Sequence, residues 1–122
     1  MGNKVLVIDD DKFIRLVYES KLKKEGFTVS SAQDGEEGFE KISKEKPDLV
    51  LLDMILPKKN GFAILEEMGS DAKLKKIPVI VFSALSQPSD IDRALKLGAK
   101  RYLPKDEYSP TEIVNEVKKI LK

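Results

Sequence analysis

The 122-residue sequence contains no cysteine and no histidine. The absence of cysteine excludes disulfides, thiolate chemistry and cysteine-based zinc sites. The absence of histidine removes the usual general base at neutral pH and the ligand of most transition-metal sites. Any metal ion in this protein must therefore be held by oxygen atoms, a donor set that favours a hard cation such as Mg²⁺.

The sequence also lacks a charge imbalance and a long apolar run. Its 22 basic and 21 acidic residues give a formal net charge of +1, so nothing indicates a nucleic-acid stripe or a membrane anchor. No apolar segment reaches the roughly 18 residues that a membrane-spanning helix needs, and the first residues show no signal-peptide hydrophobic region. We therefore expect a cytoplasmic protein with no direct nucleic-acid or membrane contact, folded as one domain over residues 1–122.

What the chain does contain is a regular alternation of β and α patterns. Apolar or β-branched runs predict strands at residues 4–8, 27–30, 48–53, 78–82 and 101–103. Helical spacing of apolar residues predicts helices at residues 12–25, 34–44, 62–68, 88–97 and 109–121. Strict alternation predicts an α/β fold with a parallel sheet and helices on both faces. With right-handed crossovers, we expect a flavodoxin-like, doubly wound sheet of five strands in the order 2-1-3-4-5, with five helices.

The third predicted strand places one carboxylate where a buried strand ends. Four apolar residues, Leu49–Leu52, separate Asp48 from Asp53. A strand buried on both faces cannot hold a charge along its length, so Asp53 must sit at its end. In an open α/β sheet, ligands bind at the carboxyl ends of the strands. Asp53 is therefore the first candidate for chemistry.

Polar residues follow the other strands at the same edge. Asp9 and Asp10 follow the first strand, Ser83 ends the fourth, and Lys105 follows the fifth. Crowded carboxylates repel one another unless a cation lies between them, and Mg²⁺ meets that need and usually brings a phosphate with it. The ammonium and the hydroxyl can bind phosphoryl oxygens. With Asp53 as nucleophile, the set predicts a phosphoryl-transfer site that forms an aspartyl phosphate without a general base.

These residues give the chain a resemblance to the receiver domains of two-component response regulators, of the stand-alone, chemotaxis-regulator-like kind. The resemblance extends over essentially all 122 residues. The matching motifs, in chain order, are Val5–Asp10, Pro47–Asp53 with Pro57 and Gly61 downstream, Val81–Ala84, and Gly98–Ala99 followed by Tyr102–Lys105.

The resemblance implies a phosphoacceptor and a metal site. Asp53 would accept the phosphoryl group. Asp9, Asp10, Asp53 and the backbone carbonyl of Ile55 would hold Mg²⁺ or Mn²⁺, with Asp10 as a direct ligand. Asp11 falls outside the family's acidic pair and is better interpreted as the residue that opens the first helix.

The resemblance also implies a phosphate clamp and a switch. Ser83, Ala84 and Lys105 would surround the phosphoryl group, with Ala84 as the small residue that the family prefers there. Ser83 and Tyr102 would form the switch, in which the aromatic ring moves inward as the hydroxyl moves to the phosphate. Lys105 is followed by Asp106, where the family usually has proline after a cis bond. Because a non-proline cis bond costs about 3 kcal/mol, this substitution argues against a cis bond here.

As a receiver, the chain would not be an enzyme beyond catalysing its own Mg²⁺-dependent phosphorylation and dephosphorylation. The expected phosphodonor is a histidine kinase or a histidine phosphotransfer protein, which in the family meets the end of the first helix that carries Phe13 and Leu16. The surface formed by residues 88–97, 101–103 and 109–121 would change on phosphorylation. We expect no output domain, an unidentified downstream protein or phosphorelay, and a monomer or a weak phosphorylation-dependent dimer.

Ile55 and Leu85 occupy the two variable positions that flank the phosphoryl group in the family. Both side chains are apolar and cannot orient an attacking water molecule. The sequence therefore predicts slow self-dephosphorylation.

Three other functions share parts of this pattern. A pseudo-receiver would bind partners without phosphorylation, although the acidic and basic residues of the site are all present. A phosphatase of the haloacid-dehalogenase type would carry a second aspartate at position 55, which is Ile55. A flavin-binding electron carrier would need a hydroxyl- or glycine-rich phosphate loop after the first strand, where Asp9–Asp11 would repel the phosphate.

Overall fold

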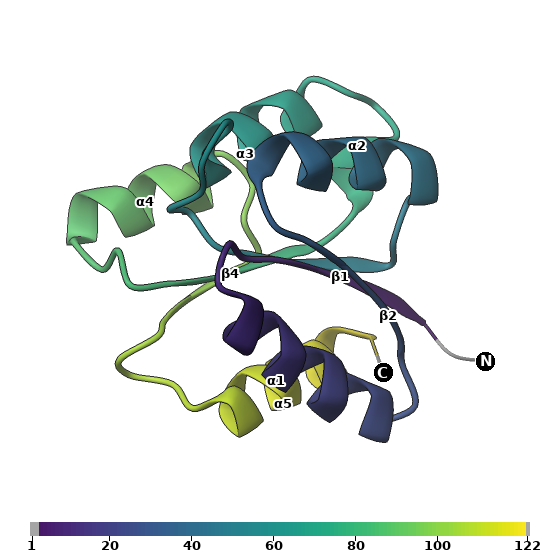
Figure 1. The fold of residues 1–122 in the computed structure, drawn as a ribbon. Helices are drawn as coiled ribbons and strands as arrows, with labels where there is room; N and C mark the ends of the chain where they lie inside the picture. Colours follow the sequence, from purple (N-terminus) through teal and green to yellow (C-terminus); the bar gives the residue numbers. More distant parts are fainter. Residues whose placement is uncertain (1–2, 122) are drawn as a thin grey trace.

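The computed structural model describes residues 3–121, and it places helices on both faces of a parallel sheet (Figure 1). The strands are β1 (Lys4–Ile8), β2 (Thr28–Ala32), β3 (Leu49–Leu52), β4 (Val79–Ser83) and β5 (Arg101–Pro104). The helices are α1 (Lys12–Lys24), α2 (Gly35–Glu45), α3 (Gly61–Gly69), α4 (Pro88–Lys96) and α5 (Pro110–Leu121), with a short 3-10 turn, η1 (Leu74–Lys76). The strand order β2-β1-β3-β4-β5 confirms the expected flavodoxin-like α/β fold.

Most element boundaries differ from the sequence predictions by one or two residues, and the short turn η1 was not predicted. Strand β2 runs to Ala32, two residues beyond the predicted end, because it pairs with β1 as far as Ile8. The turn η1 lies in a lysine-rich segment that shows no helical spacing, but its first residue, Leu74, is buried, and the Asp71 side chain accepts hydrogen bonds from the backbone N–H groups of Lys73 and Leu74. Neither difference changes the position of a strand end near Asp53.

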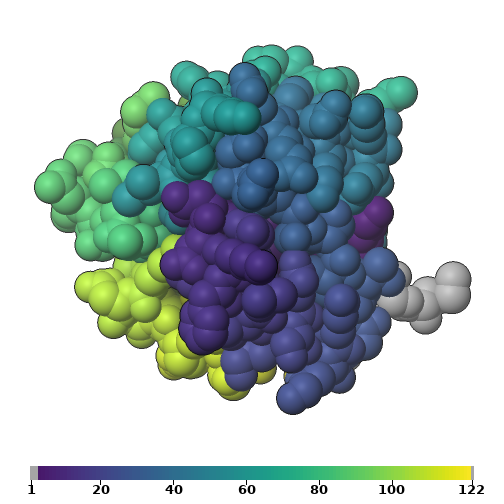
Figure 2. Space-filling model, viewed as in Figure 1, coloured from purple at the N-terminus to yellow at the C-terminus, as the bar shows by residue number. Residues whose placement is uncertain are grey.

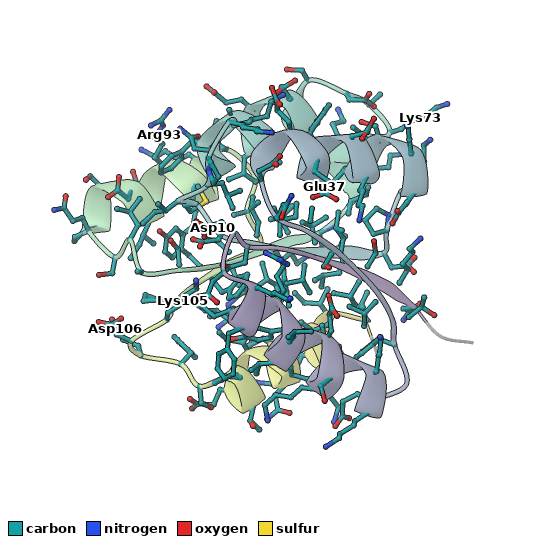
Figure 3. All side chains as sticks on the ribbon, viewed as in Figure 1. Asp10, Glu37, Lys73, Arg93, Lys105 and Asp106 are labelled. Atoms are coloured by element: carbon teal, nitrogen blue, oxygen red, sulfur yellow. The ribbon has the colours of Figure 1, made fainter. Side chains whose placement is uncertain are left out.

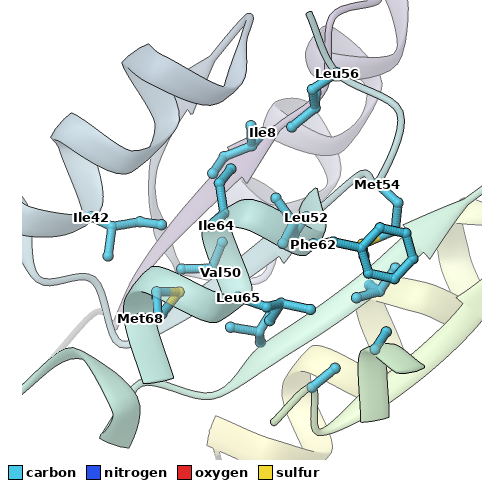
Figure 4. Packing of buried hydrophobic residues seen from close by; sticks show 14 of the residues in the cluster. Ile8, Ile42, Val50, Leu52, Met54, Leu56, Phe62, Ile64, Leu65 and Met68 are labelled. Atoms are coloured by element: carbon cyan, nitrogen blue, oxygen red, sulfur yellow. The ribbon is translucent and has the colours of Figure 1, made fainter. Parts of the chain in front are cut away.

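The sheet separates two apolar clusters, one on each face. Side chains of a strand alternate between faces, so Leu6 and Ile8 join one cluster whereas Val5 and Val7 join the other. The first cluster lies under α2, α3 and α4, and Figure 4 shows part of it, including Ile8, Ile42, Val50, Leu52 and Ile64. The second cluster lies under α1 and α5, which lie side by side in Figure 2. Both faces of β1, β3 and β4 are therefore buried, which accounts for their continuous apolar sequences.

Polar residues at three helix starts cap the helices. The side chain of Asp11 accepts a hydrogen bond from the Ile14 N–H, so Asp11 opens α1 as expected. Asp34 and Asn60 cap α2 and α3 in the same way. Such caps satisfy backbone donors that the helix leaves unpaired. None of the helices within residues 3–121 is long and apolar enough to cross a membrane.

The packing under α1 can be tested by comparing the substitution of a buried leucine with that of a partly exposed one. Leu22 of α1 is fully buried, whereas Leu95 of α4 is 43% exposed. We expect Leu22→Ala to lower the free energy of unfolding by about 3 kcal/mol, because the change removes buried methyl groups and leaves a cavity. The matched control, Leu95→Ala, should cost less than about 1 kcal/mol. Urea unfolding followed by circular dichroism measures both values, and equal losses would contradict this account of the core.

Candidate functional site

The carboxyl ends of β1, β3, β4 and β5 meet at one edge of the sheet, and the polar residues that follow them lie there together. Figure 3 shows Asp10 and Lys105 at this edge, one on the loop after β1 and the other on the loop after β5. Asp53 is placed by the sheet itself, because its N–H donates to the carbonyl of Ile8 at 3.0 Å. The backbone N–H of Lys105 donates to the carbonyl of Ser83 at 2.9 Å, which aligns the ends of β4 and β5.

Three carboxylates form the centre of the site. Asp9, Asp10 and Asp53 each present an oxygen atom within 4.8 Å of the others. Asp9 is fully buried and Asp53 is 5% exposed, whereas Asp10 is exposed. Burial raises the pKa of Asp9, even though Lys105 and the Asp11 N–H stabilise its charged form. Burial is therefore the main influence on this carboxyl group, because it disfavours the charged form.

Lys105 links two of these carboxylates. Its Nζ lies 2.8 Å from Oδ2 of Asp9 and 3.2 Å from Oδ2 of Asp53. The ammonium also lies 5.0 Å from the centre of the Phe82 ring. Burial alone would lower the pKa of Lys105, but the hydrogen bond to Asp9 and the charge of Asp53 raise it. The lysine is therefore charged and placed where it can contact a group bound to Asp53.

Ser83 and Tyr102 lie on the β4–β5 side of the site. Ser83 is fully buried, and its hydroxyl oxygen accepts a hydrogen bond from the Leu85 N–H at 3.2 Å. The Tyr102 ring is turned inward and is 8% exposed, and its hydroxyl donates to the carbonyl of Leu85. Burial raises the pKa of Tyr102. Ala84 is exposed at the start of the β4–α4 loop, next to Ser83.

A close backbone approach holds the loop after Asp53 beside α3. The N–H of Gly61 donates to the carbonyl of Met54 at 3.0 Å. A Cβ atom at position 61 would lie 2.7 Å from Cα of Met54 and 2.9 Å from the carbonyl oxygen of Asp53, so only glycine fits. The N–H of Ile55 in turn donates to Oδ1 of Asp53 at 3.2 Å. The side chain of Ile55 is 54% exposed beside the site.

Arg15, which no sequence pattern indicated, also contacts the site. Its guanidinium donates to the backbone carbonyl of Asp9 at 2.8 Å, and so ties α1 to the loop that carries Asp9 and Asp10. Arg15 lies four residues after Asp11, one helical turn into α1. The contact was not predictable from the sequence, because its acceptor is a backbone carbonyl, which every residue type has.

The donor set fits a hard divalent cation. All of the acidic cluster's donors are carboxylate oxygens, which Mg²⁺ prefers, and no soft ligand is present because the chain has no histidine or cysteine. Asp10 is exposed, and no described residue hydrogen-bonds to its carboxylate, so its oxygens are available to a cation. Within residues 3–121 there is no cis peptide bond, including the bond after Lys105.

The sequence matches the family model of the response regulator receiver domain over residues 5–118. It is 38% identical over 119 residues to a probable transcriptional regulator, ycf27, of Porphyridium aerugineum, and the matched region covers 98% of this chain and 48% of that protein. It is 35% identical over 122 residues to the alkaline phosphatase synthesis transcriptional regulatory protein PhoP of Bacillus subtilis, and the matched region covers 100% of this chain and 50% of that protein. The chain thus spans about half the length of these curated relatives.

A solved structure shares both the fold and the sequence similarity. The receiver domain of the Francisella response regulator 1452 superposes with a TM-score of 0.87 at 31% identity, covering 99% of this chain and 100% of that one.

The ammonium of Lys105 should compete with a divalent cation for the acidic cluster. We expect Lys105→Met to bind Mn²⁺ about five to ten times more tightly, because it removes a positive charge close to the cation. The matched control is Lys96→Met on α4, which removes the same charge from an exposed lysine paired with Asp92. Electron paramagnetic resonance of free Mn²⁺ gives the affinities. Unchanged or weaker binding by Lys105→Met would show that the ammonium does not oppose the cation.

Proposed function

The chain belongs to the response regulator receiver domain family, and from that premise we propose that it is a phosphorylation-dependent signalling switch with Asp53 as the phosphoacceptor. Receiver domains are signalling modules, and the site geometry supports that use. The observation that carries the proposal is the convergence of the Asp9, Asp10 and Asp53 carboxylates on one ammonium, Lys105.

In the proposed reaction, an Asp53 carboxylate oxygen attacks the phosphorus of a phosphohistidine on a histidine kinase or phosphotransfer protein. The new P–O bond forms as the P–N bond breaks, and the departing imidazole nitrogen keeps the electron pair and takes a proton from solvent. The nucleophile is already ionised, so no general base is needed. Ile55 orients the carboxylate through its N–H. Lys105 exchanges its contact with Asp53 for one with a phosphoryl oxygen.

Mg²⁺ or Mn²⁺, held by Asp9, Asp10, Asp53 and the carbonyl of Ile55, would neutralise charge on the phosphoryl oxygens. In the same proposal Ser83 donates its hydroxyl to a phosphoryl oxygen, and the small side chain of Ala84 leaves room for that group. Aspartyl phosphorylation and its reversal are the only reactions that we assign to this chain.

We further propose that Ser83 and Tyr102 convert phosphorylation into a change of surface. Movement of the Ser83 hydroxyl towards the phosphate would lengthen the bond that its oxygen accepts from the Leu85 N–H, in the loop whose carbonyl binds the Tyr102 hydroxyl. The phosphate therefore biases an existing equilibrium between two arrangements of this loop and of the α4–β5–α5 surface. A downstream protein or a phosphorelay would respond to that surface.

Exposed apolar residues support a docking place for the phosphodonor. Phe13 and Leu16, at the start of α1, are 73% and 53% exposed. An exposed aromatic residue beside a reaction site is typical of a protein contact. We propose that the kinase or phosphotransfer protein meets this end of α1, and that the chain acts as a monomer or a weak phosphorylation-dependent dimer. The alternative of a phosphorylation-independent pseudo-receiver does not explain why Lys105 and three carboxylates meet.

Acetyl phosphate or beryllofluoride with Mg²⁺ tests the phosphoacceptor. With acetyl phosphate we expect a Mg²⁺-dependent acyl phosphate of about one per chain, found by intact-protein mass spectrometry and lost in Asp53→Ala, because the nucleophile is gone. Beryllofluoride transfers no phosphoryl group, and its Mg²⁺-dependent binding, followed by shifts of amide resonances, should be lost in the same variant. The control Asp92→Ala removes an exposed aspartate on α4 and should be phosphorylated like the wild type. If the wild type forms no adduct with any of these reagents, the pseudo-receiver is the better account.

The apolar residues beside Asp53 should make its phosphate long-lived. We expect the double variant Ile55→Asn, Leu85→Glu to lose phosphate at least about tenfold faster, since a polar side chain can orient the attacking water. Release of inorganic phosphate from purified phosphoprotein measures the rate, with Leu95→Glu as a control for the added carboxylate. A double variant that is no faster than the wild type would rule out this explanation.

A further inference from the structure

We propose that the first turn of α2 positions the metal-binding loop, and that Gly35 is the positioning residue. The metal-binding loop is defined here as residues 54–60, between β3 and α3. The inference deepens the proposed function and rests on it, because it concerns how Ile55 is held beside Asp53.

Three contacts join the loop to the start of α2. The N–H of Gly35 donates to the carbonyl of Pro57 at 3.2 Å. Nζ of Lys58 lies 3.7 Å from Oδ2 of Asp34, the residue that caps α2. Nζ of Lys59 lies 4.7 Å from the centre of the Phe39 ring, one turn further along the helix. Backbone and side-chain contacts thus fix the middle of the loop against one helix turn.

The fit at Gly35 leaves no room for a side chain. A Cβ atom there would overlap the carbonyl oxygen of Lys59 and lie 2.5 Å from its carbonyl carbon. These are backbone atoms, which cannot rotate away as the end of a flexible side chain can. Any side chain at position 35 must therefore displace either α2 or the loop.

The helix is the partner that cannot move. At Gly38, one turn after Gly35, a Cβ atom would lie 2.7 Å from Cδ1 of Ile8, so α2 already packs closely on β1. Ile42 of the same helix is fully buried. Close-packed cores resist displacement, so the loop must yield.

Displacement of the loop at Lys59 reaches Ile55 because few residues lie between them and Gly61 holds the far end, so the shift strains the hydrogen bond of Ile55 to Asp53. Gly61 holds the far end against Met54, and the N–H of Ile55 bonds to Asp53 at the near end. Lys58 has a backbone φ of 71°, a value that residues other than glycine rarely adopt. The contacts around Lys58 therefore determine its backbone conformation. A short segment fixed in this way cannot absorb a shift at residue 59 without moving residue 55.

The test compares two glycine-to-alanine variants. Gly35→Ala should weaken Mn²⁺ binding about tenfold, the size of effect that follows from disturbing groups that orient metal ligands. The matched control is Gly69→Ala, at the end of α3, where the nearest atom to an added Cβ is the carbonyl oxygen of Leu97 at 3.9 Å. Its Mn²⁺ affinity should equal that of the wild type. Free Mn²⁺ is measured by electron paramagnetic resonance in buffer without urea. Urea unfolding curves first establish that each variant is folded in that buffer.

A spectroscopic measurement separates positioning from general damage. In ¹⁵N–¹H correlation spectra of the metal-free proteins, Gly35→Ala should shift the amide resonance of Ile55 and leave those of Asp10 and Lys105 in place. If all three resonances move together, the substitution acts on the whole site and the proposal is overturned.

A second variant covers a failure of Gly35→Ala to fold. Lys58→Gly relieves the positive φ and frees the loop from Asp34, and it should weaken Mn²⁺ binding about threefold, because a less ordered site loses affinity. If the wild type binds Mn²⁺ and neither variant that folds binds it more weakly, this inference is wrong and the proposed function stands. If the wild type does not bind Mn²⁺, the proposed metal site itself is wrong.

Discussion

The structure depends on one electrostatic constraint: two carboxylates follow the ends of adjacent strands whose buried residues are all apolar. Asp9 and Asp53 are almost completely buried, and burial of ionised carboxylates is costly unless positive charge lies close to them. Lys105 supplies that charge from a third strand end. Even with the nearby guanidinium of Arg15, one ammonium cannot balance three carboxylates, which leaves a net negative pocket open to solvent at Asp10. The same imbalance that costs stability is what, in the proposed function, attracts a cation and with it a phosphoryl group.

Close backbone approach is the second requirement, because the loop after Asp53 must lie beside the pocket without entering it. Gly61 allows α3 to start directly against Met54, and Gly35 allows α2 to start against Lys59. At both glycines, backbone atoms of the loop occupy the space that a side chain would need. The absence of a side chain therefore allows the helix start and the loop to lie close together. Helices on one face of the sheet are in this way connected to a site at its edge.

The fold could be predicted from the sequence because its physical signals are local and repeated. Each buried strand is a continuous apolar run, and Gly26 follows α1 where a positive φ of 93° is needed. The strand-end residues followed from the same logic, since parallel strands bring Asp9, Asp53 and Lys105 to one edge. The contact of Arg15 with a backbone carbonyl and the αL conformation of Lys58 were not predictable, because each depends on atoms that any residue type would supply.

The exposures within the site indicate how it can react without unfolding. Asp9 is held on every side: its N–H bonds to Ala32, its carbonyl to Arg15, and its two carboxylate oxygens to the Asp11 N–H and to Lys105. These contacts hold the backbone and the carboxylate of Asp9 in one position within the pocket. Lys105 instead shares its ammonium between two acceptors, so in the proposed reaction a phosphoryl oxygen would replace one of them while the other remains bonded. A fixed carboxylate beside an exchangeable lysine lets the charge in the pocket be rearranged while the strands that carry it stay in register.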